Sequence, residues 1–182
     1  LGSQNGATPE STVTEVGILA EISRATGRPV SFGLTQTLAG EGLHRQVLEL
    51  VAEANAGGAQ VHPQTTVRSV GVLFGLAHHT PYGGCPAWQA LNGLDLDQRL
   101  AHVRDPENRA QLIAEADGRE GGIDPSLLFP LDTVPADYSL RPETSLAARA
   151  EAAGSTPAAL WLDLLDATDG GCLLVWPFLN QT

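Results

Sequence analysis

The stretch that decides the fold is residues 57–77, GGAQVHPQTTVRSVGVLFGLA. Its two glycines end a helix, and Ala59-Gln60-Val61 begins a strand. Because proline has no backbone N–H to donate to a neighbouring strand, Pro63 is expected to end the pairing, which places His62 at the carboxyl end of the strand. In α/β folds, the catalytic and binding residues usually lie at the carboxyl ends of the strands.

The segments before this stretch predict a parallel βαβ unit. A helix is expected to begin at Ser11 or Thr12 and to end at Gly27, and residues 30–35 alternate in the manner of a strand. Residues 43–56 carry apolar side chains at helical spacing. A crossover helix between two short apolar strands is typical of a parallel sheet, so the expected fold class is α/β.

The rest of the chain predicts a mostly helical region. Residues 78–86 and 117–124 are expected to form loops, the second facing solvent. Helices are expected at 87–94, 95–103, 106–116, 144–153 and 158–167, and short strands at 127–131 and 172–178. The chain therefore divides into a flexible entry at 1–10, a βαβ segment at 11–77, and a helical region with a return strand at 78–182.

Composition excludes several classes of partner. The 182 residues carry a formal net charge of −11, which argues against nucleic acid and against an anionic membrane surface. No apolar run is long enough to span a membrane. The two cysteines have no metal-ligand spacing, and reduced cytosolic thiols are favoured over a disulfide between them. The expected location is the cytoplasm.

The sequence contains no methionine, so it is expected to be either a processed chain or an excised piece of a longer one, and the excised piece is favoured.

Four short blocks, in this order, carry a resemblance to a known family. They are TGRPVSFGL at 26–34, AQVHPQTTVRS at 59–69, RDPENRAQL at 104–112 and SLAARAEAAGSTPAALWLDLL at 145–165. Together they resemble the D-aminoacylase (N-acyl-D-amino-acid deacylase) branch of the amidohydrolase superfamily. The resemblance extends over about residues 12–180 of the 182.

This resemblance implies a zinc-dependent hydrolase that cleaves the amide bond of N-acyl-D-amino acids or related compounds. It implies that residues 11–77 are a segment of a (β/α)₈ barrel and that the helical region is an insertion. The remainder of the barrel would be the main partner, because the family's His-x-His pair and its metal-bound aspartate do not occur in these residues. We expect the piece alone to be inactive, and its unpaired strand edges predict association into a homo-oligomer or aggregate.

His62 is the best candidate for a metal ligand. It lies about one βα unit after Phe32, where the family typically has a ligand histidine, and barrel hydrolases place successive ligands at strand ends. A neutral imidazole there would bind Zn²⁺, which lowers the pKa of a bound water. The alternative is a hydrogen-bonded histidine at a strand end.

Arg68 and Gln64 are the candidates for substrate binding. Arg68 stands in an otherwise uncharged segment, and its guanidinium would suit the carboxylate of an N-acyl amino acid. A structural ion pair is the alternative for this arginine. His78 and His79 are adjacent, so they would point in opposite directions and are expected to be loop residues. No catalytic residue is assigned.

A second hypothesis is a non-catalytic α/β domain with a binding or structural role. Phe32, in place of a ligand histidine, favours it. Phosphate-binding loops and the Gly-x-Ser-x-Gly motif do not occur in the sequence, so neither nucleotide binding nor serine hydrolysis is supported.

Overall fold

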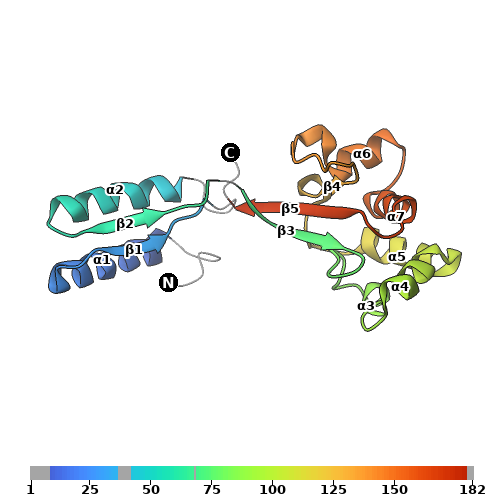
Figure 1. Cartoon of the computed structure of the whole chain (residues 1–182), viewed down its shortest axis with the longest axis horizontal. Coiled ribbons are helices and arrows are strands. Elements are labelled where there is room, and N and C mark those ends of the chain that lie inside the picture. Colours follow the sequence, from blue (N-terminus) through green and yellow to red (C-terminus); the bar gives the residue numbers. More distant parts are fainter. Residues whose placement is uncertain (1–8, 37–41, 68, 180–182) are drawn as a thin grey trace. The chain divides into compact units, whose positions relative to one another are not determined.

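The computed structural model describes residues 9–36, 42–67 and 69–179, and it shows a mixed α/β protein (Figure 1). The chain forms two compact units. The first unit comprises residues 1–70 with 178–182, and the second comprises residues 71–177.

The first unit contains the predicted parallel βαβ arrangement. Its elements are α1 (Pro9–Thr26), β1 (Val30–Gly33), α2 (Leu43–Ala56) and β2 (Val61–Gln64). β1 and β2 pair in parallel, with Val30 opposite Val61 and Gly33 opposite Gln64. The bounds of α2 are those that the apolar spacing predicts. The parallel pair and its crossover helix are therefore confirmed.

The two helices pack against one face of this small sheet. Val16 and Leu19 of α1, Val47 and Val51 of α2, and Val61 of β2 form a common buried cluster. Alternate strand residues point to opposite faces, so the residues between the packed ones lie on the other face. These four residues are exposed: Ser31, Gly33, His62 and Gln64.

Pro63 does not end the strand, and this part of the sequence analysis is wrong. The pairing continues to Gln64, whose carbonyl oxygen accepts a hydrogen bond of 2.8 Å from the N–H of Leu34. The N–H of Val61 points away from β1 and donates to Oδ1 of Asn55 at 2.8 Å. Pro63, two residues later, has its ring nitrogen on that same outer side. It therefore removes no bond of the ladder.

The sheet of the second unit is antiparallel and has the order β3-β5-β4. Its strands are β3 (Val70–Gly75), β4 (Phe129–Leu131) and β5 (Leu173–Leu179). β3 thus pairs with a strand far along the chain, although its residues were grouped by sequence with the preceding βαβ segment. Gly71 permits the close approach, because a Cβ there would lie 2.7 Å from the carbonyl oxygen of Trp176.

Five α-helices of the second unit surround a core of large side chains. They are α3 (Pro86–Gln89), α4 (Leu96–Arg104), α5 (Pro106–Gly118), α6 (Leu146–Ala152) and α7 (Pro157–Ala167), with 3₁₀ turns at Pro125–Leu127 and Pro142–Thr144. In the core the rings of Trp88 and Trp161 are stacked 5.5 Å apart. The ring of Tyr82 lies 4.9 Å from that of Trp88.

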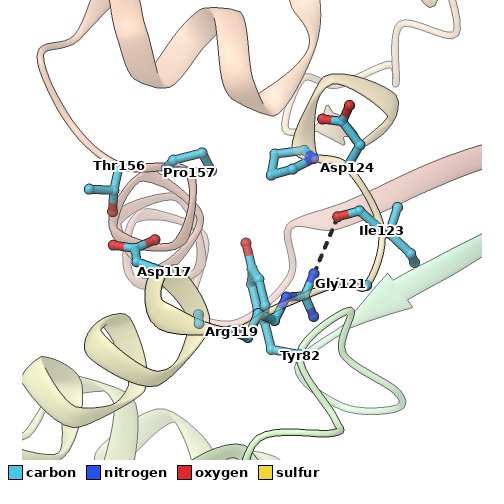
Figure 2. A pocket seen from close by; sticks show the side chains of 11 residues that line it. Tyr82, Asp117, Arg119, Gly121, Ile123, Asp124, Thr156 and Pro157 are labelled. Atoms are coloured by element: carbon cyan, nitrogen blue, oxygen red, sulfur yellow. Dashed lines mark hydrogen bonds between the residues drawn. The ribbon is translucent and has the colours of Figure 1, made fainter.

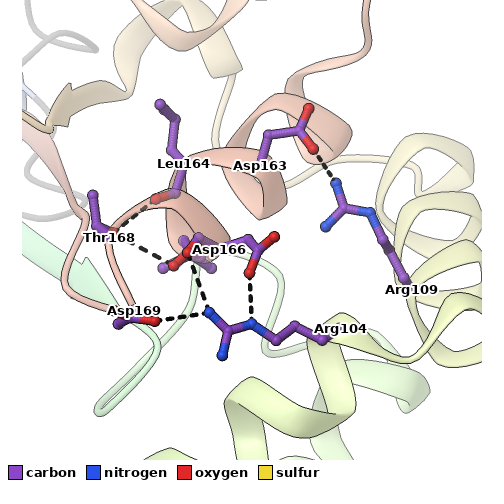
Figure 3. Close-up of polar contacts among 8 residues, drawn as sticks. Arg104, Arg109, Asp163, Leu164, Asp166, Thr168 and Asp169 are labelled. Atoms are coloured by element: carbon purple, nitrogen blue, oxygen red, sulfur yellow. Dashed lines mark hydrogen bonds and ion pairs between the residues drawn. The ribbon is translucent and has the colours of Figure 1, made fainter.

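Arginine–aspartate pairs join α4 and α5 to α7 and to the turn that follows it (Figure 3). Arg104 of α4 contacts Asp166 and, at 2.8 Å, Asp169. Arg109 of α5 contacts Asp163. These pairs are largely exposed, so each contributes little stability and they chiefly fix how the helices align.

No barrel closes within the described residues, where the sheets have two and three strands. In the same part of the chain, none of the helices combines the length and the apolar character that a membrane span requires.

Candidate functional site

The open face of the parallel sheet holds two of the candidates named from the sequence. His62 lies on β2 directly opposite Ser31 of β1, and Gln64 lies opposite Gly33. All four residues are on the face that the helices leave uncovered. The structure thus brings His62, Ser31 and Gln64 onto one polar surface.

Phe32 is not the neighbour of His62. In the observed register Phe32 pairs with Pro63, and it packs against the buried cluster under the helices. The sequence analysis matched His62 to Phe32, which is one residue beyond its true partner on β1. A one-residue shift moves a side chain to the other face of a sheet, so Ser31 is the residue that shares the face of His62.

The described residues do not complete a zinc site. Catalytic zinc is usually held by three protein ligands and a water. No group of three or more histidine, cysteine, aspartate or glutamate side chains comes together in the described part of the chain. His62 can supply one ligand, and no catalytic step through a metal follows from these residues alone.

The remaining sequence candidates lie elsewhere. Arg68 is outside the described residues. His78 and His79 are exposed in the turn that follows β3, in the second unit. There the carbonyl oxygen of His79 accepts a bond from the N–H of Gly75 at 2.9 Å. Their position in a turn agrees with the expectation that they are loop residues.

A pocket of about 530 Å³, open to solvent, lies within the second unit, and it was not anticipated from the sequence (Figure 2). We call it the Tyr82 pocket. Its polar lining residues are Tyr82, Asp117, Arg119, Asp124 and Thr156. The side chain of Tyr82 points its hydroxyl toward the middle of this space in Figure 2. The residue is only 2% exposed, and the hydroxyl oxygen has no hydrogen-bond partner among the described residues.

Arg119 is held over the ring of Tyr82. Its guanidinium carbon lies 4.7 Å from the ring centroid, which is a cation–π distance. It donates to the carbonyl oxygen of Pro81 at 2.7 Å and to that of Ile123 at 3.2 Å. Gly122 lies so close that a Cβ there would be 2.6 Å from the same guanidinium carbon. The loop at residues 119–123 therefore holds the guanidinium of Arg119 in place, and the guanidinium in turn stabilises the loop.

Charges of both signs act on the Tyr82 hydroxyl. Burial raises the pKa of Tyr82 to about 12, with Arg119 opposing the shift and Asp117 adding to it. The hydroxyl is consequently neutral at physiological pH and can donate a hydrogen bond. Thr156 caps the amino terminus of α7 by accepting a bond from the N–H of Ala159 at 3.2 Å.

The two cysteines are unsuited to nucleophilic chemistry. Cys85 and Cys172 are both free and buried. Burial, and then the charge of Asp132, raise the pKa of Cys172 to about 12, although Arg149 opposes the shift. The thiolate is the reactive form, so this thiol is inert at neutral pH.

Residues 117–124 were expected to face solvent, and most of them are exposed. Sequence reasoning missed the pocket because its walls come from segments far apart in the chain. The available signal was an arginine followed closely by two glycines, since Gly121 and Gly122 both have positive φ and let the loop fold back around Arg119. Comparisons of the chain with protein-family models, with curated proteins and with solved structures found no significant match.

Proposed function

We propose that this chain is part of a metal-dependent amidohydrolase that hydrolyses the amide bond of N-acyl-D-amino acids or related compounds. The observation that carries the proposal is the open polar face of the parallel sheet, with Ser31, His62 and Gln64 exposed opposite the helical layer. In a (β/α)₈ barrel the helices cover the outside, and the other face of each strand lines the interior. The four sequence blocks that resemble the family support the same assignment.

In this proposal β1 and β2 are two strands of the barrel. His62 supplies one zinc ligand, and Gln64 and Arg68 bind the substrate. The other ligands come from the remainder of the barrel. The free cysteines Cys85 and Cys172 favour a reducing compartment, so the enzyme would act in the cytoplasm.

The test is hydrolysis of N-acetyl-D-amino acids and their L enantiomers, together with zinc content, in the whole enzyme of which this chain is proposed to be part, without and with the substitution His62→Ala. His79→Ala is the matched control, because this histidine is also exposed but lies in a turn of the other unit. We expect His62→Ala to lose zinc and hydrolysis and His79→Ala to keep both. Hydrolysis that survives both a chelator and His62→Ala would contradict the proposal.

The second candidate, a non-catalytic α/β binding domain, is favoured by the Tyr82 pocket of the second unit. The two candidates differ in their dependence on metal. A metalloenzyme whose ligands join its structure melts at a lower temperature after chelation. A melting temperature that is independent of chelator, with no hydrolysis of any N-acyl amino acid, would favour the binding domain.

A further inference from the structure

We propose that the Tyr82 pocket is a binding site for a small zwitterion, namely a free α-amino acid. The residues that carry this inference all belong to the second unit. It therefore does not depend on the hydrolase activity proposed for the open face of the first unit.

The first step is the unsatisfied hydroxyl of Tyr82. A buried polar group without a partner costs free energy, and such groups in folded proteins call for an explanation. This hydroxyl has no partner among the described residues, and Figure 2 shows it directed into the space between Asp117 and Asp124. A ligand oxygen that accepts its hydrogen bond would satisfy it.

The second step is the charge distribution around the hydroxyl. Arg119 provides a fixed positive charge on one side, and the amino terminus of α7 at Thr156-Pro157 adds the positive end of a helix dipole. These groups suit a carboxylate. Asp117 and Asp124 provide two negative charges on the same lining, and in Figure 2 they lie on different sides of the Tyr82 hydroxyl. These groups suit an ammonium.

A ligand with a single charge would satisfy only half of this lining. A simple carboxylate would face the two aspartates without compensation. A simple amine would face Arg119 and would leave the Tyr82 hydroxyl without an acceptor. An α-amino acid carries both charges on neighbouring atoms, so it can meet both sets of groups at once.

The size of the pocket fits this class of ligand. A volume of about 530 Å³ lies within the usual range for small-molecule sites. Its apolar lining includes Ala116, Ile123 and Pro125, which leaves room for a small side chain.

Binding can be followed through the tryptophans. The Tyr82 ring lies 4.9 Å from Trp88 and 5.8 Å from Trp161, so occupation of the pocket is expected to change their fluorescence. The titration uses the whole chain with L-alanine and D-alanine, and with propionate and ethylammonium as probes of one charge each. Calorimetry measures the same affinities independently. We expect saturable binding of alanine, roughly tenfold or more tighter than either single-charge probe.

Two variants test the residues that carry the inference. Tyr82→Phe keeps the ring and removes only the hydroxyl, so the affinity for alanine is expected to fall roughly tenfold. Asp117→Asn should weaken the binding of alanine by a similar factor and leave the binding of propionate unchanged or improved. Tyr138→Phe is the matched control, since this side chain is 68% exposed and is not part of the pocket lining.

The inference is overturned by any of three results. The first is an absence of binding of both alanine enantiomers at concentrations of about 10 mM, the weak limit of specific recognition. The second is an affinity of propionate or ethylammonium equal to that of alanine. The third is an unchanged affinity for alanine in Tyr82→Phe when a thermal melt shows that the variant is folded.

Discussion

The hydroxyl of Tyr82 forms no hydrogen bond with any of the described residues. The oxygen is buried and has no partner among the described residues, whereas the ring packs against Trp88 and Trp161. Tyr82→Phe keeps that packing and removes an unsatisfied polar group. We expect it to raise the free energy of unfolding by about 1 kcal/mol, measured by urea denaturation. Tyr138→Phe should leave it unchanged, and a loss of stability in Tyr82→Phe would show that the hydroxyl has a partner.

Among the described residues, Asp132 and Arg149 form the least exposed ion pair, and this pair makes the stability of the fold sensitive to acid. Both oxygens of Asp132 accept bonds from Arg149, at 3.0 and 2.7 Å, and the two side chains are 18% and 31% exposed. The hydrogen bond from Arg149 is the main cause that lowers the pKa of Asp132 from its usual 3.8. The pair therefore stabilises the fold above about pH 4, and this contribution is lost as the pH falls through the lowered pKa.

The corresponding variant is Asp132→Asn. We expect it to reduce the free energy of unfolding by about 2 kcal/mol at neutral pH, because a charged, two-point contact is replaced by a neutral one. The difference from the native protein should shrink as the pH falls through the lowered pKa of Asp132, where the native carboxylate takes up a proton. Denaturation curves at a series of pH values check this. A difference that stays constant with pH would mean that the charge of Asp132 is unimportant.

The candidate site could be predicted from single residues only in part. His62 and Gln64 were identified by their place beside a strand end, and they do share a face of β2. The identity of their neighbour depended on register, which a sequence does not specify to one residue, so Phe32 was considered in place of Ser31. The Tyr82 pocket is formed by segments far apart in the chain, and contacts between such segments cannot be predicted from a local sequence pattern.

At the scale of elements, local chemistry predicted the helices well and one strand end badly. The helices expected at 106–116 and 158–167 both form, because Asp105 before Pro106 and Thr156 before Pro157 place a capping side chain ahead of a proline that needs no donor. The same missing donor in Pro63 was expected to end β2. It does not, because only alternate residues of a strand donate toward a given neighbour, and Pro63 faces the outer edge.

That outer edge of β2 is bound by a side chain of α2. Asn55 accepts a bond from the N–H of Val61 at 2.8 Å and donates to its carbonyl oxygen at 2.9 Å. Asn55→Ala would leave both backbone groups of Val61 without these bonds. We expect a loss of about 2 kcal/mol in the free energy of unfolding, measured by far-ultraviolet circular dichroism. Glu53→Ala, an exposed position on the same helix, should be close to neutral, and an equal loss in both variants would contradict this role of Asn55.

At the scale of the whole molecule, the chain has two separate hydrophobic cores. One cluster lies between the helices and the sheet of the first unit, and the other surrounds the stacked tryptophans of the second unit. The three tryptophans, at positions 88, 161 and 176, all belong to the second unit. Tryptophan fluorescence therefore reports on the second unit alone, whereas far-ultraviolet circular dichroism reports on both.

Because each unit has its own core, we expect two unfolding transitions rather than one. Circular dichroism should detect both, and fluorescence should detect only that of the second unit. Asn55→Ala should then lower the midpoint temperature of the first unit, which fluorescence does not detect. Asp132→Asn should lower the midpoint temperature of the second unit, which fluorescence does detect. A ligand that binds only the folded second unit, such as the amino acid proposed for the Tyr82 pocket, should raise only the midpoint temperature that fluorescence reports. If every variant and ligand moved both signals equally, the two units would unfold as a single cooperative body, and their separate cores would not be independent sources of stability.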